Sequence, residues 1–177
     1  MVYEIVDNSV DEALAGHCRH ITTVLQAGSK VTVYDDWRGI PVDIHPKTGK
    51  SALETILTTL HAGGKFDKSV YKVSWGLHWV WSSVVNALSS YMKAEVHKNW
   101  NIYMQEFKRG VPQADVAIVW ETNVSGTTIT FIPDDTIFDV MEFSYNTIAT
   151  RIKNAAYLTP WVVSVSYTHL DVYKRQL

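Results

Sequence analysis

Glu4 and Asn8 are the first residues of this chain whose types and spacing could do chemistry. They are four residues apart in a segment whose apolar residues recur at helical intervals, so they lie on one helix face, one turn from each other. A carboxylate there can take a proton from a water that attacks a phosphate, and an amide oxygen one turn away can hold a magnesium ion. An ordinary polar helix face would carry the same two residues, so the pair alone does not decide the function.

A second candidate site is the stretch Trp75-Gly76-Leu77-His78-Trp79-Val80-Trp81, which leads into a helix predicted over residues 80–91. A helix start presents free backbone N–H groups and a positive dipole end, which suit a phosphate. A phosphate cradle needs glycine so that the backbone can approach the anion, but three tryptophans stand here. The stretch has the position of an anion site and side chains that would block it.

Four other motifs have both a chemical and an ordinary interpretation. Asp35 at a strand end could accept a hydrogen bond from a base amino group, or it could form a turn. Arg38 could pair with Glu12 and lie over a ring, although surface arginines usually do neither. Gly63-Gly64-Lys65 could close over phosphates or be a plain loop. For His17-Cys18-Arg19-His20 we expect a pair of surface histidines rather than a metal cluster.

Composition limits the class of protein. With 177 residues, 46% hydrophobic and 19% charged, the chain suits one globular domain, and its net charge of −2 gives no basic field for nucleic acid. The lone Cys18 excludes a disulfide framework and a cysteine-rich metal site. No apolar run reaches membrane-spanning length and no signal peptide is visible, so we expect a cytoplasmic protein that does not contact membrane.

Hydrophobic periodicity predicts the elements that must position these residues. The predicted helices are 1–16 (with Gly16 as the stop), 51–61 (with Ser51 as N-cap and Glu54 in a capping box), 80–91 and 144–156; the predicted strands are 20–26, 31–35, 93–98, 101–108, 115–120 and 126–132, with turns at 27–30, 99 and 111–112. Helices first, then a run of strands, then a helix indicate an α+β fold. We expect a two-layer sandwich with helices on one face of a mixed, mostly antiparallel sheet.

The order of the motifs resembles one known family. The motifs are Glu4-x3-Asn8, Asp35-x-x-Arg38-Gly39-Ile40-Pro41, His61-Ala62-Gly63-Gly64-Lys65-Phe66, Gly76-Leu77-His78 and Thr122-x3-Gly126-Thr127. Over residues 1–163 the chain resembles the N-terminal ATPase domain of the gyrase B family of type II topoisomerases. This resemblance implies the Bergerat-type ATP-binding fold, which topoisomerase IV, mismatch-repair ATPases, heat-shock chaperones and histidine kinases share.

The same resemblance implies roles for individual residues. Glu4 would be the general base, Asn8 the magnesium ligand, and Asp35 the partner of the adenine amino group, supported by Thr127 through water. Lys98 would lie at the pocket rim where antibiotics of this family bind. The implied ATP contacts are Asn8, Glu12, Asp35, Arg38, Gly39, Ile40, Pro41, Lys65, Tyr71, Gly76, Leu77, His78, Val80 and Thr127.

The resemblance also implies an activity and partners. ATP turnover with Mg²⁺ would be coupled to DNA strand passage and negative supercoiling, in an ATP-dependent homodimer of gyrase B chains that works with the gyrase A protein. DNA would bind mainly outside this fragment. The topoisomerase IV ATPase chain is the alternative, and the residues Tyr71-Lys72-Val73-Ser74 favour gyrase. A non-catalytic nucleotide-binding module is the alternative from another class. We do not expect a histidine kinase, which would need a dimerising phospho-acceptor helix before the domain.

The chain departs from the family in three ways. All seven tryptophans, at 37, 75, 79, 81, 100, 120 and 161, stand where the family has glycine. Our hypothesis is that the source organism reads UGA as glycine and that the codon was rendered as tryptophan; if the tryptophans are real, we expect negligible ATP binding and an inactive fragment. Residues 164–177 resemble a translated sequencing adapter, which we expect to lie outside the domain of residues 1–163. Finally, we expect the chain to begin after the family's N-terminal arm and to stop before its transducer domain.

Overall fold

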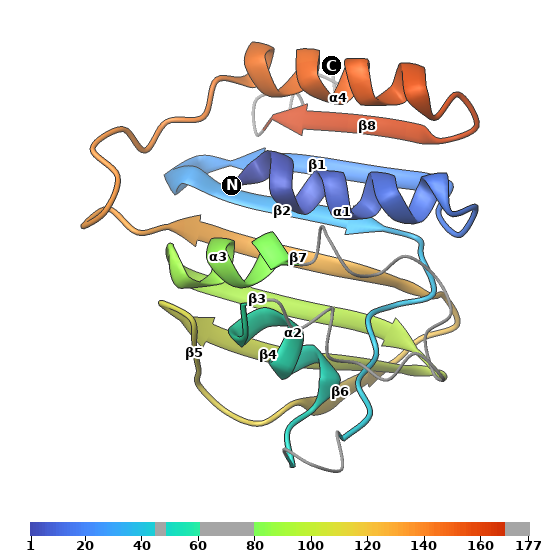
Figure 1. The fold of residues 1–177 in the computed structure, drawn as a ribbon, viewed down its shortest axis with the longest axis vertical. Coiled ribbons are helices and arrows are strands. Elements are labelled where there is room, and N and C mark those ends of the chain that lie inside the picture. Colours follow the sequence, from blue (N-terminus) through green and yellow to red (C-terminus); the bar gives the residue numbers. More distant parts are fainter. Residues whose placement is uncertain (45–48, 61–79, 169–177) are drawn as a thin grey trace, which may run out of the picture.

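One mixed sheet of eight strands carries the helices on one of its faces (Figure 1). The computed structural model describes residues 1–44, 49–60 and 80–168. In chain order the elements are α1 (Val2–Leu14), β1 (His20–Gln26), the 3-10 turn η1 (Ala27–Ser29), β2 (Lys30–Asp35), α2 (Ala52–Thr58), α3 (Val80–Ala87), β3 (Ser89–Lys98), β4 (Asn101–Lys108), β5 (Val111–Pro112), β6 (Ala117–Glu121), β7 (Gly126–Pro133), α4 (Tyr145–Leu158) and β8 (Val163–Thr168).

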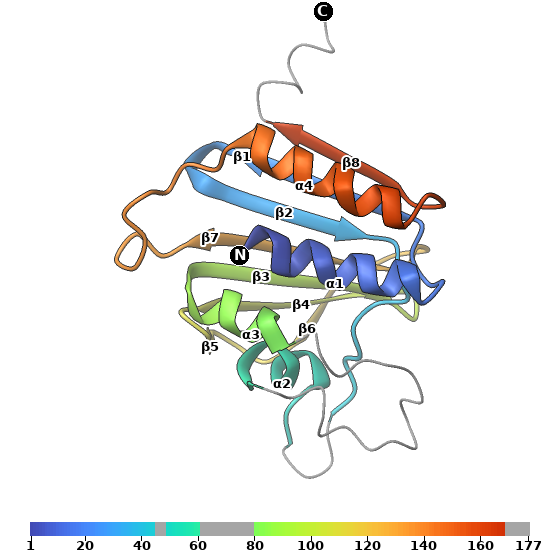
Figure 2. The same ribbon diagram turned by 45° about the horizontal axis from the view of Figure 1, so that its top comes forward.

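The strand order is β5-β4-β3-β7-β2-β1-β8, and β6 also pairs with β4. The β1–β8 pair is parallel and the other described pairs are antiparallel. Figure 2 shows α1 and α4 lying along the same face of the sheet, with α2 and α3 below them over β3 and β4. The predicted α+β sandwich on a mostly antiparallel sheet is confirmed.

Helix α1 has one stripe of residues buried against the sheet. Its buried apolar side chains are those of Val2, Ile5, Val6, Val10 and Ala13. Burying a side chain the size of valine or isoleucine contributes about 1.5–3 kcal/mol, so this stripe fixes which face of α1 meets the sheet. Asn8, Ser9 and Glu12 are buried on the same helix. The predicted stop holds: Gly16 has φ +81° and its N–H donates to Ala13 O at 2.9 Å.

Helix α2 is fixed to the sheet by a buried polar network. Ser51 is its N-cap, as predicted, and accepts a hydrogen bond from the Glu54 backbone N–H at 2.9 Å. The Glu54 carboxylate accepts from Lys50 Nζ at 2.7 Å and from Gln105 Nε2 of β4 at 2.9 Å. The helix ends at Thr58, earlier than the predicted end at 61. Asn86 of α3 donates to the carbonyl of Leu57 at 2.8 Å, so α2 and α3 are tied to each other.

Two sequence predictions between residues 80 and 112 are wrong in their boundaries. The helix predicted to 91 ends at Ala87, because the buried Ser89 hydroxyl donates to Val85 O at 2.6 Å and β3 begins there. The turn predicted at 111–112 is the short strand β5; the turn itself is formed by Arg109 and Gly110, with φ of +49° and +77°.

Trp100 occupies backbone that favours glycine. The β3–β4 hairpin turns through Asn99 and Trp100, whose φ values are +52° and +66°. Positive φ at both central residues defines a type I′ turn, for which Asn-Gly is the preferred pair. The Arg109-Gly110 turn has the same φ signature with glycine in second place. The backbone at Trp100 therefore supports the glycine hypothesis at that position.

The C-terminal part adds one helix and one edge strand. Helix α4 confirms the helix predicted over residues 144–156. It starts at the N-cap Ser144 and buries Ile148 and Ile152. Strand β8 then pairs with β1 from His20↔Val163 to Leu25↔Thr168. This strand crosses the boundary that we predicted between residues 163 and 164, so the first residues of the expected foreign tail lie in the sheet. Residues 169–177 lie outside the described residues, and the origin of the tail stays a prediction.

None of the described helices is long and apolar enough to span a bilayer.

Candidate functional site

The carboxylate of Asp35, the last residue of β2, is buried and held by three donors. Ser9 Oγ of α1 donates to Asp35 Oδ2 at 2.7 Å. The backbone N–H groups of Trp37 and Thr127 each donate to Asp35 Oδ1 at 3.3 Å. Asp35 is 6% exposed. A helix, a loop and a neighbouring strand therefore converge on this one side chain.

Pairing of β2 with β7 places Thr127 beside Asp35. The two residues are directly opposite in the antiparallel register, and Thr127 Oγ1 also accepts a hydrogen bond from the backbone N–H of Ile40 at 3.3 Å. Gly126 makes this approach possible, because a Cβ there would lie 2.3 Å from the Asp35 carbonyl oxygen. At Gly39, which has φ +79°, a Cβ would lie 2.9 Å from Val96 Cγ1. Both glycines therefore lie where a Cβ would come too close to a neighbouring atom.

Burial and hydrogen bonding act in opposite directions on the Asp35 carboxyl. Removal from water is the largest effect and raises the pKa of Asp35, because the low-dielectric interior disfavours the charged form; the net pKa is about 6. The hydrogen bonds from Ser9 and from the N–H groups of Trp37 and Thr127 lower that pKa, and the charge of Asp36 raises it. At neutral pH the carboxylate is ionised, so it can accept a further hydrogen bond but cannot donate one.

Helix α1 places Glu4 and Asn8 near α3. Glu4 is half-buried in the first turn, and Asn8 one turn later is 3% exposed. Asn8 Nδ2 donates to Ser82 Oγ of α3 at 2.6 Å. Among the described residues, Asn8 Oδ1 is a buried oxygen with no hydrogen-bond donor. An unpaired amide oxygen suits a hard divalent cation such as Mg²⁺, so this residue fits the magnesium expectation.

A small cavity is lined by both Asn8 and Asp35. It is lined by Ile5, Asn8, Ser9, Val33, Asp35, Ser82, Thr127 and Ile129 and has a volume of about 10 Å³. That is room for about one water molecule, which would have several polar partners there. The Trp37 side chain is completely buried in the core, and Arg38 Cζ lies 5.6 Å from the centre of the Trp37 ring.

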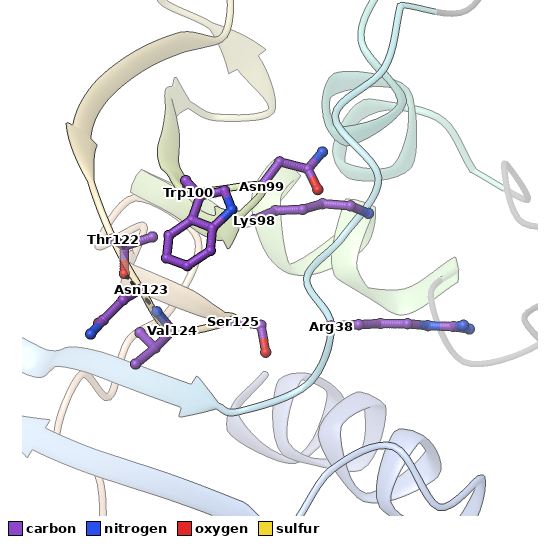
Figure 3. A pocket seen from close by; sticks show the side chains of 8 residues that line it. All are labelled: Arg38, Lys98, Asn99, Trp100, Thr122, Asn123, Val124 and Ser125. Atoms are coloured by element: carbon purple, nitrogen blue, oxygen red, sulfur yellow. Dashed lines mark hydrogen bonds between the residues drawn. The ribbon is translucent and has the colours of Figure 1, made fainter.

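A larger cavity of about 480 Å³ opens at the same end of the sheet. Figure 3 shows Arg38 reaching from the loop after β2, Lys98 from the end of β3, and Trp100 from the β3–β4 turn. Burial lowers the pKa of Lys98; the charge of Asp43 opposes this change and that of Arg38 adds to it. The remaining lining residues are Asn99, Thr122, Asn123, Val124 and Ser125. The two cations make this cavity suited to an anionic or oxygen-rich ligand.

A family model described as "Histidine kinase-, DNA gyrase B-, and HSP90-like ATPase" matches residues 1–137. The chain belongs to this ATPase family. It is 55% identical over 159 residues to the DNA gyrase B protein of Streptococcus pyogenes serotype M18, covering 89% of this chain and 24% of that protein. It is 51% identical over 160 residues to the DNA gyrase B protein of Thermotoga maritima, covering 90% of this chain and 25% of the relative.

A solved structure gives the same fold. The 43K ATPase domain of Thermus thermophilus gyrase B, in complex with an aminocoumarin, superposes with a TM-score of 0.83 at 37% identity, over 94% of this chain and 42% of that one. The chain thus spans about a quarter of the length of the curated gyrase B relatives it matches. The predicted family and fold are confirmed.

The structure brings several of the predicted ATP-site residues together. Thr127 is hydrogen-bonded to both Asp35 and Ile40, and Asn8 lines the same cavity as Asp35. Gly39 is buried, with Val96 as its nearest neighbour. Other predicted members are placed as follows: Glu12 and Pro41 are buried, Arg38 is exposed over Trp37, and Val80 begins α3. Lys65, Tyr71, Gly76, Leu77 and His78 lie outside the described residues.

Sequence reasoning missed two serines, Ser9 and Ser82, which are hydrogen-bonded to predicted site residues. Ser9 follows Ile5 by one helical turn, so its place on the apolar stripe of α1 was the signal that it faces the sheet. Ser82 carried no signal that reasoning on residues alone could have used. In the motif at 17–20, His20 Nδ1 pairs with Asp36 Oδ2 at 2.9 Å, and the described residues hold no cluster of His, Cys, Asp and Glu that could bind a metal.

Proposed function

We propose that this chain is the ATP-binding and ATP-hydrolysing domain of a type II DNA topoisomerase of the gyrase B kind. The observation that carries the proposal is the buried Asp35 carboxylate, whose three donors fix it next to a cavity that Asn8 also lines. An ionised, buried acceptor with fixed geometry suits the exocyclic amino group of adenine. The family membership and the gyrase B relatives support the same assignment.

In this proposal each described residue has a defined task. Asp35 accepts the adenine amino hydrogen bond, with Thr127 supporting it through the water-sized cavity, and Ile40 and Pro41 line the base. Glu4 takes a proton from the attacking water, and Asn8 Oδ1 is the ligand for Mg²⁺. Magnesium bound there supplies charge neutralisation on the phosphates. The backbone at Gly76, Leu77 and His78 and the helix start at Val80 are proposed to surround the triphosphate, with Lys65 and Tyr71 over the nucleotide. Arg38 is proposed to stack beside the adenine and to pair with Glu12.

The activity of the whole protein follows as part of the proposal. ATP binding and hydrolysis would drive DNA strand passage and negative supercoiling, in a cytoplasmic homodimer of gyrase B chains acting with the gyrase A protein. The topoisomerase IV ATPase chain remains the alternative, because it would share these residues. The aminocoumarin in the Thermus thermophilus structure also suggests a ligand class for this chain, with Arg38 and Lys98 as its cationic contacts in the 480 Å³ cavity.

The test is calorimetry with a non-hydrolysable ATP analogue. We expect negligible binding by the chain with its seven tryptophans, because Trp79 and Trp81 stand at the helix start that must approach the phosphates. We expect binding by a variant with glycine at all seven tryptophan positions, and loss of that binding in the same background with Asp35→Ala. Tight binding by the tryptophan-containing chain would refute the blocked-site expectation, and no binding by either would refute the proposed function.

Hydrolysis needs a separate measurement in the full-length, glycine-restored protein. Glu4→Ala is expected to abolish turnover while nucleotide binding remains, because the carboxylate acts on the attacking water and not on the bound base. ATPase activity that is unaffected by Glu4→Ala would exclude Glu4 as the general base.

A further inference from the structure

Ser82 and Asn8 form a hydrogen bond that joins α3 to α1 inside the protein. Asn8 Nδ2 donates to Ser82 Oγ at 2.6 Å, and Asn8 and Ser82 are 3% and 1% exposed. No donor among the described residues reaches Asn8 Oδ1. One end of the amide is therefore engaged, and the other end is a buried, unpaired oxygen.

The orientation of this amide decides whether it can bind a cation. The two ends of an asparagine side chain have nearly the same shape, but one is an acceptor and the other carries two N–H donors. A hard divalent cation takes the oxygen and is repelled by the NH₂ group. An unpaired buried oxygen also destabilises the free protein. A ligand that pairs with this oxygen binds more tightly, because the cost of removing the oxygen from water is already present before binding.

We propose that Ser82 is a positioning residue for the divalent cation. Its hydroxyl engages the NH₂ end of Asn8 and so turns Oδ1 toward the metal, as outer-shell groups orient metal ligands in general. This inference rests on the proposed function, because Asn8 is a metal ligand only within it. A purely structural tie between α1 and α3 would use the same hydrogen bond, so the test has to separate the two roles.

The variants are Ser82→Thr and Ser82→Val, which have nearly the same shape and differ in the hydroxyl. Both add a methyl group beside the small cavity, so any steric effect is common to them. Ser83→Ala removes the neighbouring buried serine of α3 and controls for general loosening of that helix. Asn8→Ala identifies the Asn8 side-chain amide signals by their loss.

The first measurement needs no nucleotide. Hydrogen exchange of the Asn8 side-chain amide is followed by NMR, with Mn²⁺ alone then added as a paramagnetic probe. We expect slow hydrogen exchange in the wild type and in Ser82→Thr, and fast exchange in Ser82→Val. We also expect the Asn8 signals to broaden at a Mn²⁺ concentration about tenfold lower in the threonine variant than in the valine variant. Equal exchange or equal Mn²⁺ concentrations in the matched pair would overturn the proposal.

The second measurement adds the non-hydrolysable ATP analogue in the glycine-restored background. With Mn²⁺ we expect the valine variant to bind the analogue about tenfold more weakly than the threonine variant, whereas in EDTA the two are expected to be equal. An equal loss in EDTA would mean a structural role only and would overturn the proposal. If no variant binds the analogue at all, the proposed function fails, while the nucleotide-free comparison still decides the role of Ser82.

Discussion

The hydroxyl of Ser9 lies 2.7 Å from Oδ2 of Asp35 and donates to it, which joins α1 to the end of β2. The bond stabilises the ionised carboxylate in a place where burial disfavours charge. A residue on the apolar stripe of a helix thereby controls the protonation of the group that is proposed to recognise adenine.

Ser9→Ala should raise the pKa of Asp35 above about 6, because burial then acts with one opposing hydrogen bond fewer. The pKa can be measured by NMR titration of the labelled Asp35 carboxyl carbon. Ser125→Ala, at an exposed serine, is the control and should leave the titration unchanged. An unaltered Asp35 pKa in Ser9→Ala would show that the hydrogen bond contributes nothing to ionisation.

Asp35→Asn should make stability less dependent on pH. The folded pKa of about 6 lies above the ordinary 3.8, so the contribution of Asp35 to stability is fully present below about pH 3.8 and is lost as pH rises through 6. The unfolding free energy of Asp35→Asn relative to wild type should therefore rise between about pH 4 and 6, by about 3 kcal/mol in total, and stay level above.

Urea unfolding at about pH 3.5, 5, 6 and 7.5 measures this difference. Parallel pH profiles for the two proteins would contradict the raised pKa. In the same Asp35→Asn variant with glycines restored, analogue binding should weaken at neutral pH, because the charged acceptor is gone.

Trp100→Gly should stabilise the protein, by about 1 kcal/mol relative to Trp100→Ala. Both substitutions remove the indole, but alanine keeps the Cβ that disfavours the positive φ of +66° at this turn. Thermal unfolding of the pair separates the backbone effect from loss of the side chain. Equal stability of the two variants would mean that the turn does not require glycine.

Gly126→Ala should destabilise the protein by on the order of 3 kcal/mol, because the new Cβ would lie 2.3 Å from the backbone oxygen of Asp35. Gly28→Ala is the matched control: it has φ +71° but nothing within 4 Å of its Cβ position, so only the backbone cost of about 1 kcal/mol applies. Denaturant unfolding compares them. A similar loss in both variants would mean that the contact with Asp35 relaxes without cost.

The coding DNA should carry TGA at the codons for all seven tryptophans. The reason is that the family resemblance leads us to expect glycine at these positions, and that Trp100 has the backbone of a type I′ turn. Sequencing the gene with its flanks gives the answer and also identifies residues 164–177. TGG at most of the seven codons would exclude the reassignment.

Local patterns predicted the elements whose signals are local. Strands β1 and β2 and the cap at Ser51 follow from alternation and capping residues. The start of β3 was missed because the helical spacing continues past Ala87, and only the buried contact of Ser89 ends the helix there.

The site depended on contacts that no local pattern contains. Thr127 reaches Asp35 across 92 residues, and Asn8 reaches Ser82 across 74. Family resemblance supplied Thr127, since its motif is shared, but it supplied neither Ser9 nor Ser82. Their hydrogen bonds come from the packing of α1 against β2 and α3, which the sequence specifies only through the whole fold.

The pairing of Asp35 with Thr127 also makes the site depend on the correct register between β2 and β7. A slip of one residue between β2 and β7 would turn every side chain of β2 to the opposite face and carry the Asp35 carboxylate away from α1. Such a slip would also bring a residue with a side chain to the place where Gly126 touches the Asp35 backbone, where there is no room for it. The number of nucleotide sites per chain should therefore report the fraction of molecules with correctly aligned strands, because a chain misfolded in this way would not bind.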